Sequence, residues 1–148
     1  MLKNKKMKKY TDEFLKEGVA LKRLIKEYNQ YGYLCIGVDF DDVLSPYENL
    51  KGTHHQVIQL IKDLRANITC KIVCWTANPN IEYVKAYLAK HEIPYDGINC
   101  DGIEVGYPCR KPVFSALLDD RAGLKETYDY LTEFLNYIKK NKQDGIKA

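Results

Sequence analysis

Two kinds of hydrophobic pattern alternate along the chain. Short, mostly apolar runs are typical of strands buried on both faces of a parallel sheet, and they predict strands at residues 34–38, 71–75 and 114–118, with a weaker one at 97–100. Apolar residues spaced three and four apart predict amphipathic helices at residues 11–28, 54–65, 80–91 and 124–140. Thr11 is expected to cap the first helix, Gly32 to end it, and Pro94 to end the third.

This alternation of helices and strands determines the expected fold class. Long connections between strands predict a parallel sheet joined by right-handed crossovers, in an α/β, three-layer, Rossmann-like arrangement with helices on both faces. A chain of 148 residues is expected to form a single domain. Its expected parts are a basic tail (1–10), an N-terminal helix (11–30), a catalytic core (33–140) and a polar tail (141–148).

Composition and charge refine this expectation. The 23 basic and 20 acidic side chains give a net charge of +3, but residues 31–135 carry 10 basic and 15 acidic side chains, so the positive excess lies at the two ends. The longest uncharged stretch, 28–38, is much shorter than the ~20 residues that span a bilayer, so no membrane association is expected. Five cysteines without a CxxC pair fit a reducing compartment and predict a cytoplasmic location.

Aspartates follow the first and last predicted strands. Asp39 and Asp41 are two apart on an extended segment, so their side chains point to the same side. Because ligands bind at the carboxyl ends of parallel strands, Asp39 and Asp41 are expected to meet Thr76, Asp119 and Asp120 there. Carboxylates ~4 Å apart repel by about 4 kcal/mol at an effective dielectric of ~20, and an all-oxygen cluster suits Mg²⁺. The alternative is that these acids are unrelated loop residues or helix caps.

These residues, in this order, resemble the four motifs of the haloacid dehalogenase (HAD) superfamily of phosphatases and phosphotransferases. Residues 39–44 (DFDDVL) are similar to its DxDx(T/V) nucleophile loop, and residues 72–76 (IVCWT) to its strand ending in Ser or Thr. Lys111 is similar to its conserved lysine, and residues 117–120 (LLDD) to its acidic fourth motif. Within the superfamily, the details are most similar to 5'(3')-deoxyribonucleotidase-like and small phage-type members.

The resemblance implies catalytic and metal-binding roles for the aspartates. Asp39 would attack phosphorus to form an aspartyl-phosphate, and Asp41 would act as general acid and then as general base. Mg²⁺ would be held by Asp39, Asp119, Asp120 and the backbone carbonyl of Asp41. The glycine that usually follows the second aspartate is replaced by Asp42, which restricts the turn and adds a charge near the site.

The resemblance also implies residues that bind the phosphate. Thr76 would donate a hydrogen bond to a phosphate oxygen, and Lys111 would neutralise the phosphate charge. Arg110 is an alternative to Lys111, because the two neighbours point to opposite faces of an extended segment and their register is not fixed by the sequence.

Members of the superfamily usually enclose small substrates with an inserted cap domain, which has no counterpart here. The expected site is therefore open, which suits a phosphorylated group that protrudes into solvent, such as a nucleic-acid end, unless a second copy of the chain or the N-terminal helix acts as a lid. Four residues in bordering loops are candidates to contact a base: Tyr47, His54, His55 and Tyr107. The alternative is that they are ordinary surface residues, with His54 and His55 at an exposed helix start. Trp75 is expected to point into the core.

The function expected from these observations is Mg²⁺-dependent hydrolysis of a phosphate monoester on a phosphorylated small molecule, in particular a nucleotide, or on a nucleic-acid end. One alternative is a non-catalytic module that binds phosphate or nucleic acid. Another is a phosphotransferase with an acceptor other than water, which would use the same residues.

Overall fold

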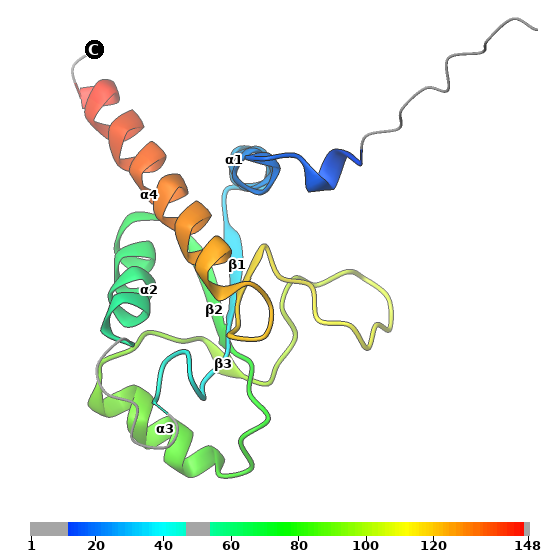
Figure 1. Cartoon of the computed structure of the whole chain (residues 1–148), viewed down its shortest axis with the longest axis vertical. Helices are drawn as coiled ribbons and strands as arrows, with labels where there is room; N and C mark the ends of the chain where they lie inside the picture. The colour runs from blue at the N-terminus through cyan, green and yellow to red at the C-terminus, as the bar shows by residue number, and fades with distance from the viewer. Residues whose placement is uncertain (1–11, 47–53, 147–148) are drawn as a thin grey trace, which may run out of the picture.

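The computed structural model describes residues 12–46 and 54–146, which form a parallel sheet with helices packed on it (Figure 1). The elements are η1 (Glu13–Leu15), α1 (Val19–Tyr31), β1 (Leu34–Val38), α2 (His55–Asn67), β2 (Cys70–Cys74), α3 (Ile81–Lys90), β3 (Gly97–Ile98), β4 (Ala116–Leu118) and α4 (Leu124–Ile146). This is the predicted α/β, Rossmann-like fold. Within the described residues, no cap domain is inserted after β1 or β2.

The sheet has the strand order β3-β2-β1-β4, and every pair is parallel. β1 lies in the interior of the sheet and is buried along its whole length, which explains its continuously apolar sequence. Val38, its last residue, pairs with Cys74 of β2 and with Leu118 of β4. The three strands therefore end at the same level. In Figure 1, α2 and α3 lie on one side of the sheet, and α1 lies above the start of β1, where Tyr28 packs against Phe134 of α4.

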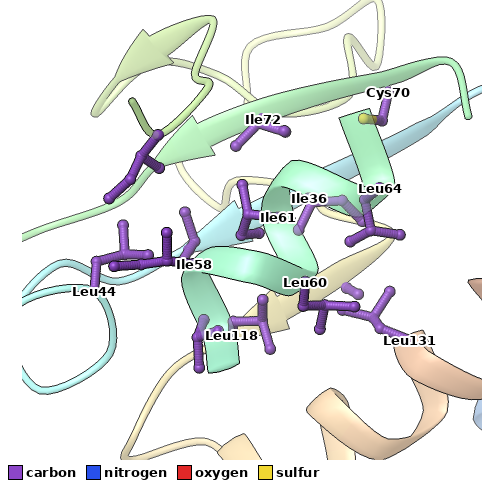
Figure 2. Close-up of a cluster of buried hydrophobic side chains, with 14 of the residues drawn as sticks. Ile36, Leu44, Ile58, Leu60, Ile61, Leu64, Cys70, Ile72, Leu118 and Leu131 are labelled. Carbon is purple, nitrogen blue, oxygen red and sulfur yellow. The ribbon is translucent and has the colours of Figure 1, made fainter. Parts of the chain in front are cut away.

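The hydrophobic core lies between α2 and the sheet. Figure 2 shows Ile61 and Leu64 of α2 against Ile36 of β1, and Leu60 directed toward Leu131 of α4. Each fully buried side chain of this size contributes roughly 1.5–3 kcal/mol, so this face fixes the position of the helix on the sheet. The buried residues of α2 are Val57, Ile58, Leu60, Ile61 and Leu64.

The N-terminal helix begins later than predicted. Asp12 Oδ1 accepts a hydrogen bond from the Phe14 N–H at 3.0 Å, but only the short η1 turn follows it. Gly18 then adopts the left-handed region at φ 74°, which interrupts the helical path, and α1 begins at Val19. The predicted cap, Thr11, lies outside the described residues. Gly32 ends α1 as predicted.

The last strand and the last helix also differ from their predicted bounds. β4 begins at Ala116 rather than at residue 114, because Ser115 is held by side-chain bonds: its Oγ accepts from the Cys35 N–H and donates to Glu27. α4 continues to Ile146, so most of the predicted polar tail is helical. Its residues after 140 include no proline, and lysine and glutamine are good helix formers. No helix among the described residues has the length and apolar character needed to cross a membrane.

Candidate active site

A cavity of about 700 Å³ lies at the carboxyl ends of β1, β2 and β4. The predicted convergence of these strand ends is therefore confirmed. Aspartates from two loops dominate its wall, together with residues that follow β2 and one arginine. The lining residues are Asp39, Asp41, Asp42, Trp75, Thr76, Ala77, Asn99, Asp119, Asp120 and Arg121.

Backbone pairing beyond the strand ends holds the cavity wall in place. The Asp39 N–H donates to the carbonyl of Leu118 at 2.9 Å, so the aspartate that follows β1 lies beside the end of β4. The Trp75 N–H donates to the carbonyl of Val38 at 2.8 Å, which fixes the start of the loop after β2. Both positions follow from the common level at which the three strands end.

Three carboxylates in the cavity are close enough to share one cation. Asp39, Asp119 and Asp120 each offer an oxygen, and these oxygens lie within 4.8 Å of one another. Ligands at ~2.1 Å on opposite sides of a Mg²⁺ ion are about 4.2 Å apart, so a small inward movement of the side chains would complete the set. The donors are all oxygen, which suits Mg²⁺. Asp41, whose backbone carbonyl is predicted as a further ligand, lines the same cavity, and its carboxylate does not belong to this group.

Ionisation of these neighbouring acids is unfavourable, as the pKa of Asp39 shows. Burial, the charge of Asp119 and interactions with Asp120 raise the pKa of Asp39 from 3.8 to about 6, although the hydrogen bond from the Phe40 N–H at 2.7 Å acts in the opposite direction. Among the described residues, no ion pair involves any of the three acids. The cluster therefore carries negative charge that the neighbouring protein groups do not fully compensate.

The loop after β1 directs Asp41 into the same cavity. Phe40 is fully buried and packs edge-to-face against Tyr87 of α3, with ring centroids 5.2 Å apart, so the flanking aspartates face the opposite way, as predicted. Both oxygens of Asp41 lie 3.3 Å from Nδ2 of Asn78, which orients the carboxylate. Asp42 has φ 61°, a conformation that glycine adopts at lower cost and that aspartate tolerates better than most residues.

Thr76 lies in the cavity wall as predicted. It is 8% exposed, and its Oγ1 accepts a hydrogen bond from the Asn78 N–H at 3.0 Å. Its own N–H donates to Oδ1 of Asn99 at 2.8 Å. The two asparagines, which sequence reasoning did not select, therefore hold Thr76 in position. The hydroxyl hydrogen of Thr76 is left to donate to a bound oxygen.

The structure does not bring Lys111 and Arg110 to the aspartates. Both are exposed and line a separate hollow of about 670 Å³, which residues 101–113 form among themselves. The extended approach to the strand that would carry them to the cavity does not form, because β4 starts only at Ala116 and the preceding loop projects from the sheet (Figure 1). The cationic residue in the cavity wall is instead Arg121.

Arg121 was missed from the sequence because it follows the acidic motif rather than preceding it. Its N–H donates to Oδ1 of Asp119 at 2.8 Å, so the backbone fixes it next to the carboxylate cluster. Its side chain is exposed. A turn of adjacent acidic and basic residues, D119-D120-R121, is the signal that could have identified it.

The predicted aromatic contacts are also placed differently. Tyr107 is 67% exposed and lines the hollow of residues 101–113, while His54 and His55 line another hollow beside α3. Tyr47 lies outside the described residues. Trp75, expected in the core, lines the carboxylate cavity and is only partly buried. Its ring packs against Phe114, which precedes β4.

Comparisons with protein-family models, with curated proteins and with solved structures give no match to this chain. The function therefore has to be argued from the cavity itself.

Proposed function

We propose that the protein is a Mg²⁺-dependent phosphatase that hydrolyses a phosphate monoester of a nucleotide or of a nucleic-acid end through an aspartyl-phosphate on Asp39. The observation that carries this proposal is the convergence of Asp39, Asp119 and Asp120 with Asp41 and Thr76 in one cavity. The order of these residues along the chain, which resembles the HAD superfamily, supports the same reaction.

In the first step, an oxygen of Asp39 attacks phosphorus, a P–O bond to Asp39 forms, and the ester P–O bond breaks. Asp41 gives its proton to the leaving oxygen, which departs as an alcohol. The position of Asp41 suits this role because it lies two residues from Asp39 and faces the same cavity. Asn78 holds the Asp41 carboxylate in place while the proton moves.

In the second step, a water molecule attacks the phosphorus of the aspartyl-phosphate. Asp41, now ionised, takes a proton from the water, the acyl-phosphate bond breaks, and inorganic phosphate leaves. Thr76 donates a hydrogen bond to a phosphate oxygen in both steps. Two-step transfer through a carboxylate replaces one difficult displacement by two easier ones.

Asp39, Asp119 and Asp120 are the residues that would hold Mg²⁺. The ion, when bound, supplies charge neutralisation for the phosphate oxygens and for the carboxylates themselves. Arg121 supplies a further positive charge in the cavity wall and could form a paired contact with phosphate. Lys111 and Arg110 keep this role only if the loop of residues 101–113 moves toward the aspartates.

The proposal is tested by hydrolysis of p-nitrophenyl phosphate with Mg²⁺ and with EDTA. Asp39→Asn keeps the shape of the side chain but removes the nucleophile, so we expect a loss of at least about 1,000-fold in kcat. Asp101→Asn is the matched control, because Asp101 is exposed and lines a different hollow. Wild-type turnover by Asp39→Asn, or equal turnover with EDTA, would refute the mechanism. Absence of turnover in the wild type would favour a phosphate-binding module.

A further inference from the structure

Trp75 is the only tryptophan of the chain, and it lies in the wall of the carboxylate cavity. It directly follows β2 and precedes Thr76, the residue proposed to bind the phosphate, and both residues line this cavity. It is partly buried, so part of its surface is accessible. A ligand ring that covered the exposed part of this aromatic surface would gain free energy from the apolar area buried.

The surrounding residues hold this indole rigidly. Its ring packs against Phe114 at a centroid distance of 6.0 Å and an interplanar angle of 66°, and its backbone N–H is bonded to Val38. Phe114 in turn packs over Gly37 of β1, where a Cβ atom would come within 2.8 Å of the phenyl ring. This packing restricts the indole before any ligand binds, which lowers the conformational entropy lost when a ring stacks on it.

The remainder of the cavity wall is polar. Five carboxylates, one guanidinium, a threonine and an asparagine line it, and Ala77 is the only other apolar side chain among its lining residues. A sugar phosphate would satisfy the polar wall but would leave the indole without a partner. A nucleobase offers a flat π surface that stacks on any aromatic ring, and a cavity of about 700 Å³ is large enough for a nucleotide.

We propose that Trp75 stacks on the base of a nucleoside phosphate whose phosphate lies against Thr76 and Asp39. This inference rests on the proposed phosphatase function and assigns recognition of the substrate's base to Trp75, which requires a base within reach of the phosphate. The base could belong to a free nucleotide or to the terminal residue of a nucleic acid, which share this chemistry.

The first test compares two substrates that differ only in the base, adenosine 5'-monophosphate and ribose 5-phosphate. We expect the wild type to prefer the nucleotide by roughly tenfold or more in kcat/KM, as one stacked base contributes. Trp75→Phe keeps an aromatic ring and should retain part of the preference, whereas Trp75→Leu keeps apolar bulk and should lose it. Tyr107→Ala, which removes an exposed ring outside the cavity, should retain the full preference. Equal kcat/KM for both substrates in the wild type would overturn the role of Trp75 and leave the phosphatase proposal intact.

The second test needs no turnover and no change to the indole. In Asp39→Asn, the fluorescence of the single tryptophan reports directly on its surroundings. We expect quenching by adenosine 5'-monophosphate that saturates, and none by ribose 5-phosphate at the same concentrations. Saturable base-dependent quenching in Asp39→Asn supports the base site, and if the wild type also hydrolyses none of these compounds, the phosphatase is refuted while the base site stands. Equal responses to both compounds would refute the base site.

A third comparison distinguishes the two sources of the base. The mononucleotide is set against a 5'-phosphorylated and a 3'-phosphorylated oligonucleotide in the same fluorescence titration. Tighter binding of an oligonucleotide identifies a nucleic-acid end as the substrate, and tighter binding of the mononucleotide identifies a free nucleotide. Both results support stacking on Trp75, while failure of all three to quench would overturn it.

Discussion

Asp39 and Asp96 are both aspartates beside a strand of the sheet, but their carboxyls have opposite surroundings. Burial acts to raise the pKa of Asp96, yet hydrogen bonds from Arg65 at 2.5 Å and from the Ile72 N–H at 2.7 Å, with the charges of Arg65 and Lys71, hold it below its usual value. At Asp39, burial and the neighbouring acids raise the pKa to about 6. One carboxyl is compensated within the chain and the other is not.

The difference separates a structural acid from one that can take part in chemistry. The Asp96 carboxylate joins the end of α2 to β2 through Arg65 and Ile72, so its charge is used in holding two elements together. Asp39, Asp119 and Asp120 take part in no ion pair among the described residues, and they lie at the edge of the sheet where ligands of such folds bind. An added cation should therefore bind to the carboxylates of the cavity and have little effect at Asp96.

The largest expected effect is on the response to Mg²⁺. A Mg²⁺ concentration of about 100 times its Kd stabilises the folded state by about 2.7 kcal/mol. For a domain of this size, that raises Tm by about 5 °C or more. Asp119→Asn should lose this shift and about 100-fold in turnover, because it removes one of three oxygen ligands. Thermal unfolding with Mg²⁺ and with EDTA measures the shift.

Asp96→Asn is the matched control for that measurement, since it also converts an aspartate beside the sheet to its amide. It should keep the Mg²⁺ shift and the turnover, although its Tm is expected to be lower under all conditions because the pair with Arg65 is lost. A Mg²⁺ shift of equal size in Asp119→Asn and in Asp96→Asn would break the distinction between the two regions.

A smaller effect is expected from removing the positive charge of Arg121 in the cavity wall. Arg121→Gln should raise KM for p-nitrophenyl phosphate roughly tenfold, because a charged hydrogen bond to the anion contributes about 1.5–3 kcal/mol. Lys111→Gln should raise KM less, since Lys111 is exposed in the loop of residues 101–113. Steady-state kinetics of the two variants gives the comparison. A larger effect of Lys111→Gln would show that the loop brings its cation to the phosphate.

The fold and the acidic part of the site could be predicted because local patterns determine them. The continuous apolar run of β1 fixes a buried strand, and a parallel sheet brings Asp39 and Asp119 to one edge whatever the loops do. Phe40 and its flanking aspartates follow from the alternation of an extended segment.

The loop residues could not be predicted in the same way. The position of Lys111 depends on the path of residues 99–115, which contain no repeating pattern and whose backbone is bonded to β1 at Ser115. The exposure of Trp75 depends on how its ring packs against Phe114, which is a question of packing between distant segments. Gly18 shortened the first helix although the spacing of its apolar residues favoured a longer one.

The smallest expected effect is a difference in the pH dependence of stability, measured without metal. Since the folded-state pKa of Asp39 is about 6 and its ordinary value 3.8, the folded protein binds this proton more tightly than the unfolded chain, and stability falls as the pH rises from about 4 to 6. Asp39→Asn removes this loss. It should be more stable than the wild type at pH 8, by about 1 kcal/mol after solvent screening in the open cavity, and equal to it near pH 4.

The contribution of Asp96 to stability changes with pH in the opposite direction. Its lowered pKa stabilises the folded state above about pH 4, and this contribution disappears as the pH falls through the folded-state pKa. Asp96→Asn should therefore be less stable than the wild type at pH 7, by about 0.5–1 kcal/mol for a pair this exposed, and the gap should close in acid. Urea unfolding in EDTA at pH 3, 4, 6 and 8 measures both variants. If both amide variants shift stability in the same direction at pH 8, the two carboxyls do not differ in compensation, and the charge argument for the cavity fails with them.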